Sequence, residues 1–313
     1  MSLAFVFPGQ GSQSVGMLGA LSRVSPVIEG TFADASAVLG YDLWKRCQEG
    51  PAEALNATEC TQPAMLSAGV ATYRLWLERG GPAPALMAGH SLGEFSALVA
   101  AGCLKFKEAV DLVKFRAEAM QAAVPLGQGA MAAILGLEDT DVEAACDEAA
   151  QGEVVEAVNY NAPGQVVIAG AAAAVARAIE AASARGARRA VLLPVSVPAH
   201  SSLMEPAAAR LRERLEQVEV MPAAGIAVYG VDVKTHATAA EIRAGLVKQL
   251  HTPVYWASTV RTMVAAGATR IVECGPGKVL TALNRRVEKN RDLKMLALED
   301  PAALADALAE VRS

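Results

Sequence analysis

A glycine–histidine–serine–leucine–glycine stretch, residues 89–93, has the residue types and spacing of a serine nucleophile. In the pattern Gly-x-Ser-x-Gly, small neighbours let the serine, here Ser91, occupy a sharp turn with its hydroxyl clear of the backbone. Apolar residues 85–88 predict a strand before the turn, and the alternating small and apolar residues after it predict a helix. At such a helix start, the N–H of Leu92 would face an oxyanion formed by attack of Ser91 on a carbonyl. The stretch therefore predicts acyl-group chemistry, although the pattern also arises by chance in chains rich in Gly and Ala.

A serine nucleophile needs a general base, and the chain has four histidines. His90 adjoins Ser91, so its ring should point away from the hydroxyl and support the turn. His236 lies in a polar stretch and is interpreted as a surface residue. His251 is either a supporting residue near the site or a buried imidazole with its hydrogen bonds satisfied. His200, in a loop, is the best candidate for the base, although a lone loop histidine can equally be structural.

Composition narrows the classes of protein that the 313 residues can form. A chain with 53% hydrophobic but only 4% aromatic residues fills its core with Ala, Val and Leu, which suits helices packed on a parallel sheet. A net charge of −5 without a dense basic stripe argues against nucleic-acid binding. Five scattered cysteines indicate neither a disulfide framework nor a metal site. Residues 1–7 carry no basic leader and reach a Pro-Gly turn too soon for a signal peptide or membrane span, so we expect a cytoplasmic protein without membrane contact.

The elements that must position Ser91 are predicted to form a sheet with helices packed on it, as in an α/β fold. Residues 3–7 predict a buried strand that ends in a polar glycine loop at residues 8–13, and such loops are where α/β sheets place their ligands. Helical patterns follow to residue 79, and a long amphipathic helix covers residues 107–124. Later in the chain, further strands are predicted at residues 226–229, 270–273 and 294–298, an amphipathic helix contains Leu203, Leu211 and Leu215, and a last helix after Asp300 ends at residue 311.

The middle of the chain has a different pattern. Strands are predicted at residues 130–137, 154–159, 166–169 and 190–195, with helices at residues 141–150 and 171–184. The order β-α-β-β-α-β is that of a ferredoxin-like unit. We therefore predict an inserted subdomain over residues 125–196, and a catalytic core formed by residues 1–124 and 197–313.

Six motifs, in this order and spacing, resemble the bacterial malonyl-CoA:acyl carrier protein transacylases of type II fatty-acid synthesis. They are residues 7–13, 89–94, Arg116, residues 161–165, residues 198–200 and residues 273–277. The resemblance covers essentially the whole chain. It implies an α/β fold in which a hydrolase-like core, with a parallel sheet flanked by helices, carries a ferredoxin-like (βαββαβ) insertion, and the order of elements indicates that insertion independently.

The resemblance implies a ping-pong transfer of the malonyl group. Ser91 would attack malonyl-CoA with His200 as base, and the thiol of the carrier's phosphopantetheine would then take the malonyl group from the enzyme ester. The N–H groups of Gln10 and Leu92 would hold the oxyanion. The family uses no acidic third residue, and the main-chain carbonyl of Gln249 matches the position that holds the imidazole. The resemblance implies no cofactor, because malonyl-CoA is a substrate. It implies no metal either.

Arg116 is the residue that would recognise the substrate's carboxylate. A planar guanidinium can bind a carboxylate with two hydrogen bonds in a dry pocket, and this group distinguishes malonyl from acetyl. Without the resemblance, an Arg at this position of a helix reads as a solvated surface residue. Gln62 and Met120 match positions lining the same pocket but also suit ordinary helix packing, and Asn161 of the fourth motif is a further supporting residue.

The partners implied are malonyl-CoA and a holo acyl carrier protein, bound by a monomeric enzyme. Because carriers of this family are acidic, local basic side chains should dock them, although scattered solubilising charge explains the same residues. The candidates are Arg185, Arg188 and Arg189 in the insertion and Lys278, Arg285, Arg286 and Lys289 near the second glycine loop. Which of them bind CoA and which bind the carrier is not decided by the pattern.

Two departures and three alternatives qualify this prediction. Ala199 replaces the serine common before the catalytic histidine, with little effect expected, and Leu92 favours malonyl over methylmalonyl, where relatives carry Gln. An α/β-hydrolase esterase or thioesterase shares the serine pattern but expects its histidine near the C-terminus. A polyketide acyltransferase with another carrier remains open. A non-catalytic carrier-binding protein is disfavoured by the intact set of Ser91, His200 and Arg116.

Overall fold

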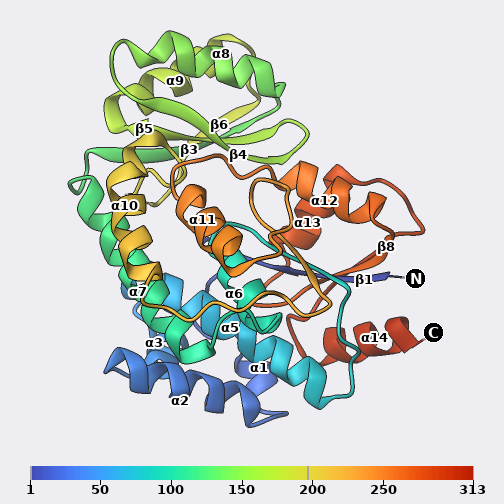
Figure 1. The fold of residues 1–313 in the computed structure, drawn as a ribbon. Helices are drawn as coiled ribbons and strands as arrows, with labels where there is room; N and C mark the ends of the chain where they lie inside the picture. Colours follow the sequence, from blue (N-terminus) through green and yellow to red (C-terminus); the bar gives the residue numbers. More distant parts are fainter. Residues whose placement is uncertain (1, 196, 313) are drawn as a thin grey trace.

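Two sheets of different type organise the molecule (Figure 1). The computed structural model describes residues 2–195 and 197–312, so residues 1, 196 and 313, which end the predicted domain ranges, lie outside the described part. The larger sheet has the order β7-β2-β1-β8-β9, and all its pairings are parallel. Its strands are β1 (Ser2–Phe7), β2 (Leu86–Gly89), β7 (Ala227–Tyr229), β8 (Ala268–Glu273) and β9 (Lys294–Ala297).

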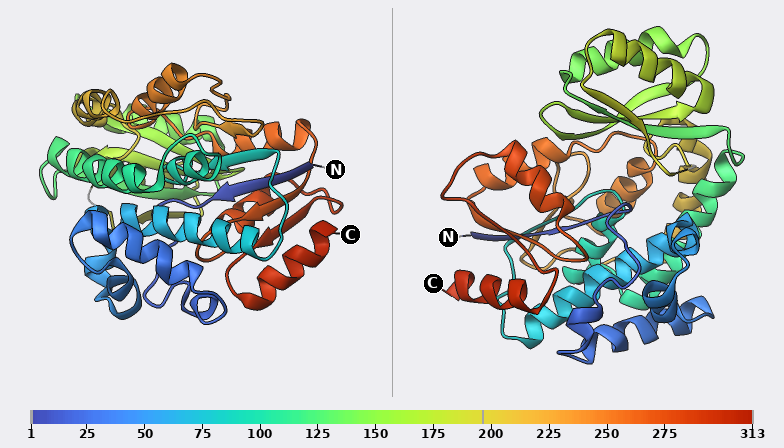
Figure 2. Two further views of the ribbon diagram at one scale, coloured as in Figure 1. Left: turned by 60° about the horizontal axis from the view of Figure 1, so that its bottom comes forward. Right: turned by 180° about the vertical axis from the view of Figure 1, so that it is seen from behind.

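The parallel sheet is covered on both faces, as parallel sheets require. Alternate residues of the central strand β1 enter different cores: Phe5 and Phe7 pack on one face, and Ala4 and Val6 on the other. This explains why β1 reads as an unbroken apolar run rather than an alternating one. Figure 2 shows the sheet between its helical layers.

The helices of this core lie before and after the second sheet in the chain. The sheet face that carries Phe5 and Phe7 is covered mainly by helices from the first half of the chain and by the last helix. The face that carries Ala4 and Val6 is covered by α12 and α13. The helices are α1 (Gly19–Ser22), α2 (Val27–Leu39), α3 (Leu43–Glu49), α4 (Ala52–Asn56), α5 (Thr58–Glu78), α6 (Gly93–Ala100), α7 (Phe106–Ala123), α10 (Glu205–Leu215), α11 (Ala239–Gln249), α12 (Trp256–Ala265), α13 (Val279–Val287) and α14 (Pro301–Arg312), with a short 3-10 turn at Ser202–Met204.

The second sheet is antiparallel and has the order β4-β5-β3-β6. Its elements are β3 (Gly129–Leu135), α8 (Asp139–Ala150), β4 (Val155–Ala162), β5 (Gln165–Ala171), α9 (Ala172–Ala184) and β6 (Arg189–Leu192). Helices α8 and α9 pack on one face through a core built largely of Ala and Val. The predicted fold class, a parallel sheet flanked by helices with a separate antiparallel subdomain, is confirmed. The strand predicted to end at residue 195 ends at Leu192, because Pro194 has no N–H to continue the ladder and the N–H of Val195 donates to the carbonyl of Leu193 instead.

The antiparallel sheet is joined by hydrogen bonds to the part of the molecule that contains the parallel sheet. The N–H of Tyr160 donates to the carbonyl of Val254 at 2.9 Å, and Val254 N–H donates to the carbonyl of Val158 at 2.8 Å. Ser202 donates from its backbone N–H to Glu156 at 2.9 Å. These bonds hold the uncovered face of the sheet over the core, so that Met131 and Asn159 help to line the candidate active site.

Across residues 2–195 and 197–312, none of the helices has both the length and the apolar character needed to cross a membrane. In the same ranges, no group of three or more His, Cys, Asp and Glu side chains is arranged to hold a metal ion. All five cysteines are free and buried.

Candidate active site

Ser91 occupies a sharp turn between β2 and α6, as the sequence predicts. Its backbone φ of 52° lies in the left-handed region, which exposes the hydroxyl. The flanking glycines are sterically required: a Cβ on Gly89 would lie 1.8 Å from the carbonyl carbon of Gly93, and a Cβ on Gly93 would lie 2.0 Å from the carbonyl oxygen of Phe7. The turn is therefore locked against the central strand.

His200 completes a serine–histidine pair. Its Nε2 lies 2.7 Å from Ser91 Oγ, and its Nδ1 lies 2.7 Å from the main-chain oxygen of Gln249. A carbonyl can only accept, so the proton is on Nδ1 and the lone pair of Nε2 faces the serine hydroxyl. The backbone N–H of His200 also donates to the carbonyl of Leu250 at 2.9 Å, which fixes the loop. The arrangement is that of a nucleophile and its base.

Burial keeps this imidazole neutral. His200 is 2% exposed. The loss of solvation, together with the positive charge of Arg116, lowers its pKa to about 3. The ring is thus ready to accept a proton from Ser91 at any physiological pH.

The loop after β1 lies against the serine turn. A Cβ on Gly9 would lie 2.4 Å from the carbonyl oxygen of His90 and 3.7 Å from the backbone nitrogen of Leu92, so only glycine allows this approach. Gln10 follows and lines the same cavity as Ser91. In the described part of the chain, neither Gln10 nor Leu92 uses its backbone N–H in a hydrogen bond. Two free donors therefore flank the nucleophile, and their role in holding an oxyanion stays a prediction.

Arg116 is buried, which contradicts the interpretation from the residues alone as a solvated side chain. It is 2% exposed, because α7 turns this position towards the cavity, and its guanidinium lies over the ring of Phe95 at 5.5 Å. Nη1 donates to Gln62 Oε1 at 2.7 Å and Nη2 to Gln249 Oε1 at 3.0 Å. Burial lowers its pKa to about 10, an effect that the charge of Glu94 opposes.

The guanidinium is still charged at neutral pH and lacks an acidic partner. Among the described residues, Arg116 forms no ion pair, and its buried Nε–H has no hydrogen-bond partner. Both of its bonds go to neutral amide oxygens. A buried cation in this condition is suited to an anion from outside.

A cavity of about 600 Å³ brings most of the predicted residues together. Its lining includes Gln10, Ser91, Leu92, Arg116, Met120 and His200. Gln62 and Gln249 lie behind Arg116, and Gln62 Nε2 reaches Met120 Sδ at 3.5 Å. Asn161 is not part of the cavity lining, and its Oδ1 lies 2.7 Å from His90 Nε2. The ring of His90 packs against that of Trp256, with their centroids 5.5 Å apart.

The two remaining histidines lie outside this cavity. His236, predicted to be a surface residue, has a side chain only 17% exposed and lies 3.4 Å from Asp232. That prediction was wrong because the loop folds back on itself, with Thr235 bridging to Tyr229. His251 is half-buried and does not contribute to the cavity lining within the described chain.

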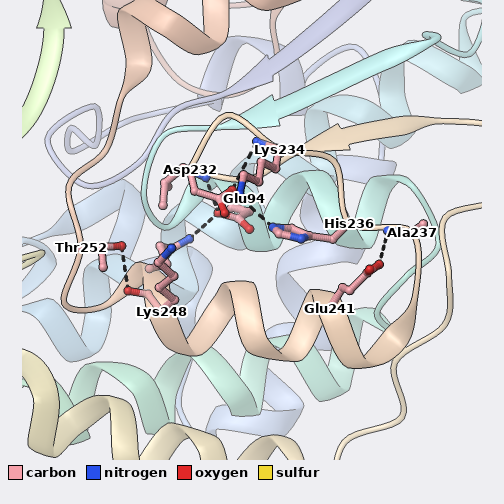
Figure 3. Close-up of polar contacts among 10 residues, drawn as sticks. Glu94, Asp232, Lys234, His236, Ala237, Glu241, Lys248 and Thr252 are labelled. Carbon is pink, nitrogen blue, oxygen red and sulfur yellow. Dashed lines mark hydrogen bonds and ion pairs between the residues drawn. The ribbon is translucent and has the colours of Figure 1, made fainter.

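Sequence reasoning missed Glu94 and the side chain of Gln249. Gln249 Nε2 donates to Glu94 Oε2 at 2.7 Å and to the main-chain oxygen of Ser91 at 3.1 Å. Glu94 is 3% exposed, and burial raises its pKa to about 7. Figure 3 shows it between α11 and the loop that carries Asp232 and His236. A signal was present: Glu94 is the sole charged residue of the otherwise apolar or small α6.

The predicted docking residues are spread over the surface. Arg185 forms an ion pair with Glu148 at 2.6 Å, and Lys278 with Glu299 at 3.0 Å. Arg286 donates to the carbonyl of Pro163 at 3.1 Å, in the hairpin that follows Asn161. Arg285 and Lys289 border a separate surface hollow. Their part in docking stays a prediction.

Comparison with known proteins places the whole chain in one family. The model of the acyl transferase domain matches residues 4–299. The chain is 54% identical over 305 residues to the malonyl CoA-acyl carrier protein transacylase of Escherichia coli (strain K12), covering 97% of this chain and 98% of the relative. It is similar to the solved malonyl CoA-acyl carrier protein transacylase of Coxiella burnetii, at 45% identity and a TM-score of 0.97 over 100% and 98% of the two chains. It is also similar to a malonyl-transacylase solved in complex with a type II PKS acyl-carrier protein, at 51% identity and a TM-score of 0.96 over 99% and 100%. The chain therefore belongs to the acyl transferase domain family.

Proposed function

We propose that this protein transfers the malonyl group from malonyl-CoA to the phosphopantetheine thiol of an acyl carrier protein, as an [acyl-carrier-protein] S-malonyltransferase that supplies fatty-acid elongation. The observation that carries the proposal is one cavity that holds both a serine–histidine pair at 2.7 Å and a buried arginine without an acidic partner among the described residues. The first group reacts with acyl carbonyls, and the second fits the carboxylate that malonyl has and acetyl lacks. The names of the relatives agree with this assignment.

In the first half-reaction, Ser91 Oγ attacks the thioester carbon while its proton passes to His200 Nε2. The N–H groups of Gln10 and Leu92 stabilise the negative charge on the tetrahedral oxygen. The carbon–sulfur bond then breaks, and the CoA sulfur leaves with the proton from His200. The products are a malonyl ester on Ser91 and free CoA.

The second half-reaction follows the steps of the first in reverse order, with the carrier's thiol in place of that of CoA. His200 takes the proton of the carrier's phosphopantetheine thiol, and the sulfur attacks the ester carbonyl. The same two N–H groups hold the oxyanion. The carbon–oxygen bond to Ser91 breaks and the serine recovers its proton from His200, so malonyl leaves on the carrier. Atoms and protons balance without any cofactor or metal.

Arg116 selects the substrate in this scheme. Its guanidinium binds the malonyl carboxylate, which supplies the anion that the buried cation lacks. Gln62 and Gln249 hold the guanidinium plane by accepting from Nη1 and Nη2. Met120 and Asn161 support the pocket and the serine turn. An acetyl group would leave the arginine uncompensated.

The proposal extends to partners and compartment. The partners are malonyl-CoA and holo carrier protein, with the basic residues of the insertion and of the second glycine loop as docking candidates for a monomeric enzyme. Five free cysteines suit a reducing compartment, which supports the cytoplasm.

A polyketide carrier is the second candidate acceptor. It is favoured by the similarity to the malonyl-transacylase solved with a type II PKS acyl-carrier protein. The chemistry would be the same, and only the acidic surface of the carrier would differ. Transfer rates to carriers of both kinds distinguish the two.

Intact-protein mass after brief mixing with malonyl-CoA tests the proposal, followed by a chase with holo carrier protein. A malonyl adduct is expected on the wild-type protein and not on Ser91→Ala, and the chase should move the adduct to the carrier. Acetyl-CoA and methylmalonyl-CoA serve as comparison donors. An adduct that is lost to water without the carrier would contradict transfer and indicate a hydrolase.

A further inference from the structure

Gln249 is the point where three parts of the active site meet. It is fully buried at the end of α11. Its main-chain oxygen accepts from His200 Nδ1 at 2.7 Å, and its side-chain oxygen accepts from Arg116 Nη2 at 3.0 Å. Its side-chain nitrogen donates to the main-chain oxygen of Ser91 at 3.1 Å. One residue therefore touches the base, the carboxylate-binding cation and the backbone of the nucleophile.

The orientation of this amide is determined by its neighbours. Arg116 can only donate, so the amide oxygen must face it, and the amide nitrogen must then face Glu94. Glu94 Oε2 accepts from Gln249 Nε2 at 2.7 Å and from the backbone N–H of Val231 at 3.3 Å. Both donors are buried, so the loss of this acceptor would leave the N–H of Val231 and one N–H of the Gln249 amide without a partner.

We infer that Glu94 is a positioning residue: its carboxyl oxygen holds the side chain of Gln249, and Gln249 in turn holds His200 and Arg116 in one geometry. The inference deepens the proposed function, on which it rests. Glu94 is not part of the cavity lining, and in the described structure its side chain forms no hydrogen bond with the side chain of Ser91 or His200; its backbone N–H donates to the main-chain oxygen of Ser91 at 3.0 Å. It lies three residues after Ser91 in the first turn of α6, so its carboxyl is anchored to the same turn that presents the nucleophile.

The charge of Glu94 and its role as a hydrogen-bond acceptor can be changed independently by substitution. The charged and titratable side chains around it are Asp232 and His236 from the loop after β7, Lys248 from α11 and Arg116 from α7. A Cβ on Gly230 would lie 3.3 Å from Glu94 Oε1, so the loop closes tightly over the carboxyl (Figure 3). Because both hydrogen bonds end on Oε2, glutamine can accept them with its oxygen while removing the charge.

Single-turnover acylation of Ser91 with saturating malonyl-CoA or acetyl-CoA, followed by intact mass, tests the inference. Glu94→Leu removes the acceptor and should lower the rate about a hundredfold with both donors, because His200 is displaced in either case. Glu94→Gln keeps the acceptor and should stay within about fivefold of wild type. Glu94→Asp withdraws the carboxyl by one methylene, and an intermediate loss with both donors is expected. The rates are expressed per folded molecule, so a merely structural role would not move them.

Glu241→Gln is the matched control. Glu241 lies at the other end of α11, where it accepts from the backbone N–H groups of Ala237 and Thr238 at 2.9 Å. The same substitution there should leave both acylation rates unchanged. It shows whether loosening α11 itself is enough to disturb Gln249.

A double-mutant cycle that combines Glu94→Asp with Gln249→Leu tests whether Glu94 acts through the side chain of Gln249. If Glu94 acts through the Gln249 side chain, Glu94→Asp should lower the rate in the wild-type background and have no further effect once Gln249→Leu is present. Additive losses would overturn the inference. So would wild-type rates in Glu94→Leu and Glu94→Asp, a loss confined to malonyl-CoA, or a Glu94→Gln protein as slow as Glu94→Leu.

Labelling of Ser91 by a fluorophosphonate keeps this inference apart from the proposed function. The reagent needs the serine–histidine pair but no acyl-CoA. Slower labelling in Glu94→Leu and Glu94→Asp, with a normal rate in Glu94→Gln, would support the positioning role whatever the natural acyl donor is. If Glu94→Leu does not fold, Glu94→Asp carries the same comparison, and labelling at the wild-type rate would overturn the inference.

Discussion

The two halves of the serine–histidine pair are held in different ways. Ser91 is positioned mainly by its own turn and by one neighbouring strand, through glycines that pack on each other and on Phe7, with one bond from the distant Gln249 amide to its main-chain oxygen. His200 is positioned by Gln249 and Leu250, about fifty residues further along the chain, and its environment depends on Arg116. The nucleophile half is thus sensitive to small changes within the turn. The base half is sensitive to changes at residues distant in sequence.

The most severe test of the nucleophile half is Gly93→Ala. The added Cβ would lie 2.0 Å from a backbone oxygen of Phe7, which no side-chain movement relieves. We expect a loss of more than about 3 kcal/mol in the free energy of unfolding, with loss of acyl-enzyme formation. Urea unfolding and intact mass measure the two effects.

Gly30→Ala is the matched control. Gly30 is exposed within α2, and a Cβ there would meet nothing within 4 Å. The substitution should raise the free energy of unfolding by about 0.5–1 kcal/mol, because alanine favours the helix. Equal effects of the two substitutions would contradict the account of the turn.

The residue beside the base half that binds the substrate's carboxylate is tested by Arg116→Ala. We expect kcat/KM for malonyl-CoA to fall about a thousandfold, because a buried charged partner of the carboxylate is removed. Transfer from acetyl-CoA should be retained in part. Arg116→Lys keeps the charge without the two-pronged geometry and should recover only part of the malonyl activity. An equal loss with both donors would contradict the assigned role.

This contrast also separates what the sequence could and could not predict. The serine turn was predictable because its signal is local: a strand, two glycines and a helix lie within a few residues. The elements of both sheets were predictable from apolar runs and glycine turns, with differences at their ends. His200 was one of four histidines, and nothing local in the chain distinguished it beyond doubt.

Position 116 lies on the apolar face of α7 with Val113 and Met120, but an arginine there was interpreted as solvated because charged side chains are rarely buried. Resemblance to a family was needed to assign it. Glu94 and the amide of Gln249 were missed because their partners are 155 residues apart and meet only in the folded chain. Polar residues in buried, otherwise apolar helices are the one sequence signal that points to such pairs.

The pH dependence of the free energy of unfolding tests whether the Glu94 carboxyl, which contacts Gln249 next to the base half, is buried as described. In the folded protein the pKa of Glu94 is raised to about 7, whereas the unfolded chain has the ordinary value of 4.5. Between these values only the folded state keeps the proton, so the contribution of this group to the free energy of unfolding falls as pH rises, by about 3 kcal/mol. Glu94→Gln should remove this fall. Parallel pH curves for the variant and wild type would show that the carboxyl is not buried as described.

The smallest expected effect concerns the base itself. Because the pKa of His200 is lowered to about 3, protonation of the imidazole should not slow acylation between pH 8 and pH 5. An ordinary histidine would lose about thirtyfold at pH 5. Acylation rates of Glu94→Gln, in which the titration of Glu94 is absent, isolate the imidazole. A decline centred near pH 6.5 would contradict the account.

A crystal structure of the protein trapped with malonyl-CoA would show the acyl group in place. We expect a malonyl ester on Ser91 Oγ, its carbonyl oxygen towards the N–H groups of Gln10 and Leu92, and its carboxylate bound by two nitrogens of Arg116. An ester whose carboxylate lies away from Arg116, or an acyl group on any residue other than Ser91, would contradict this expectation.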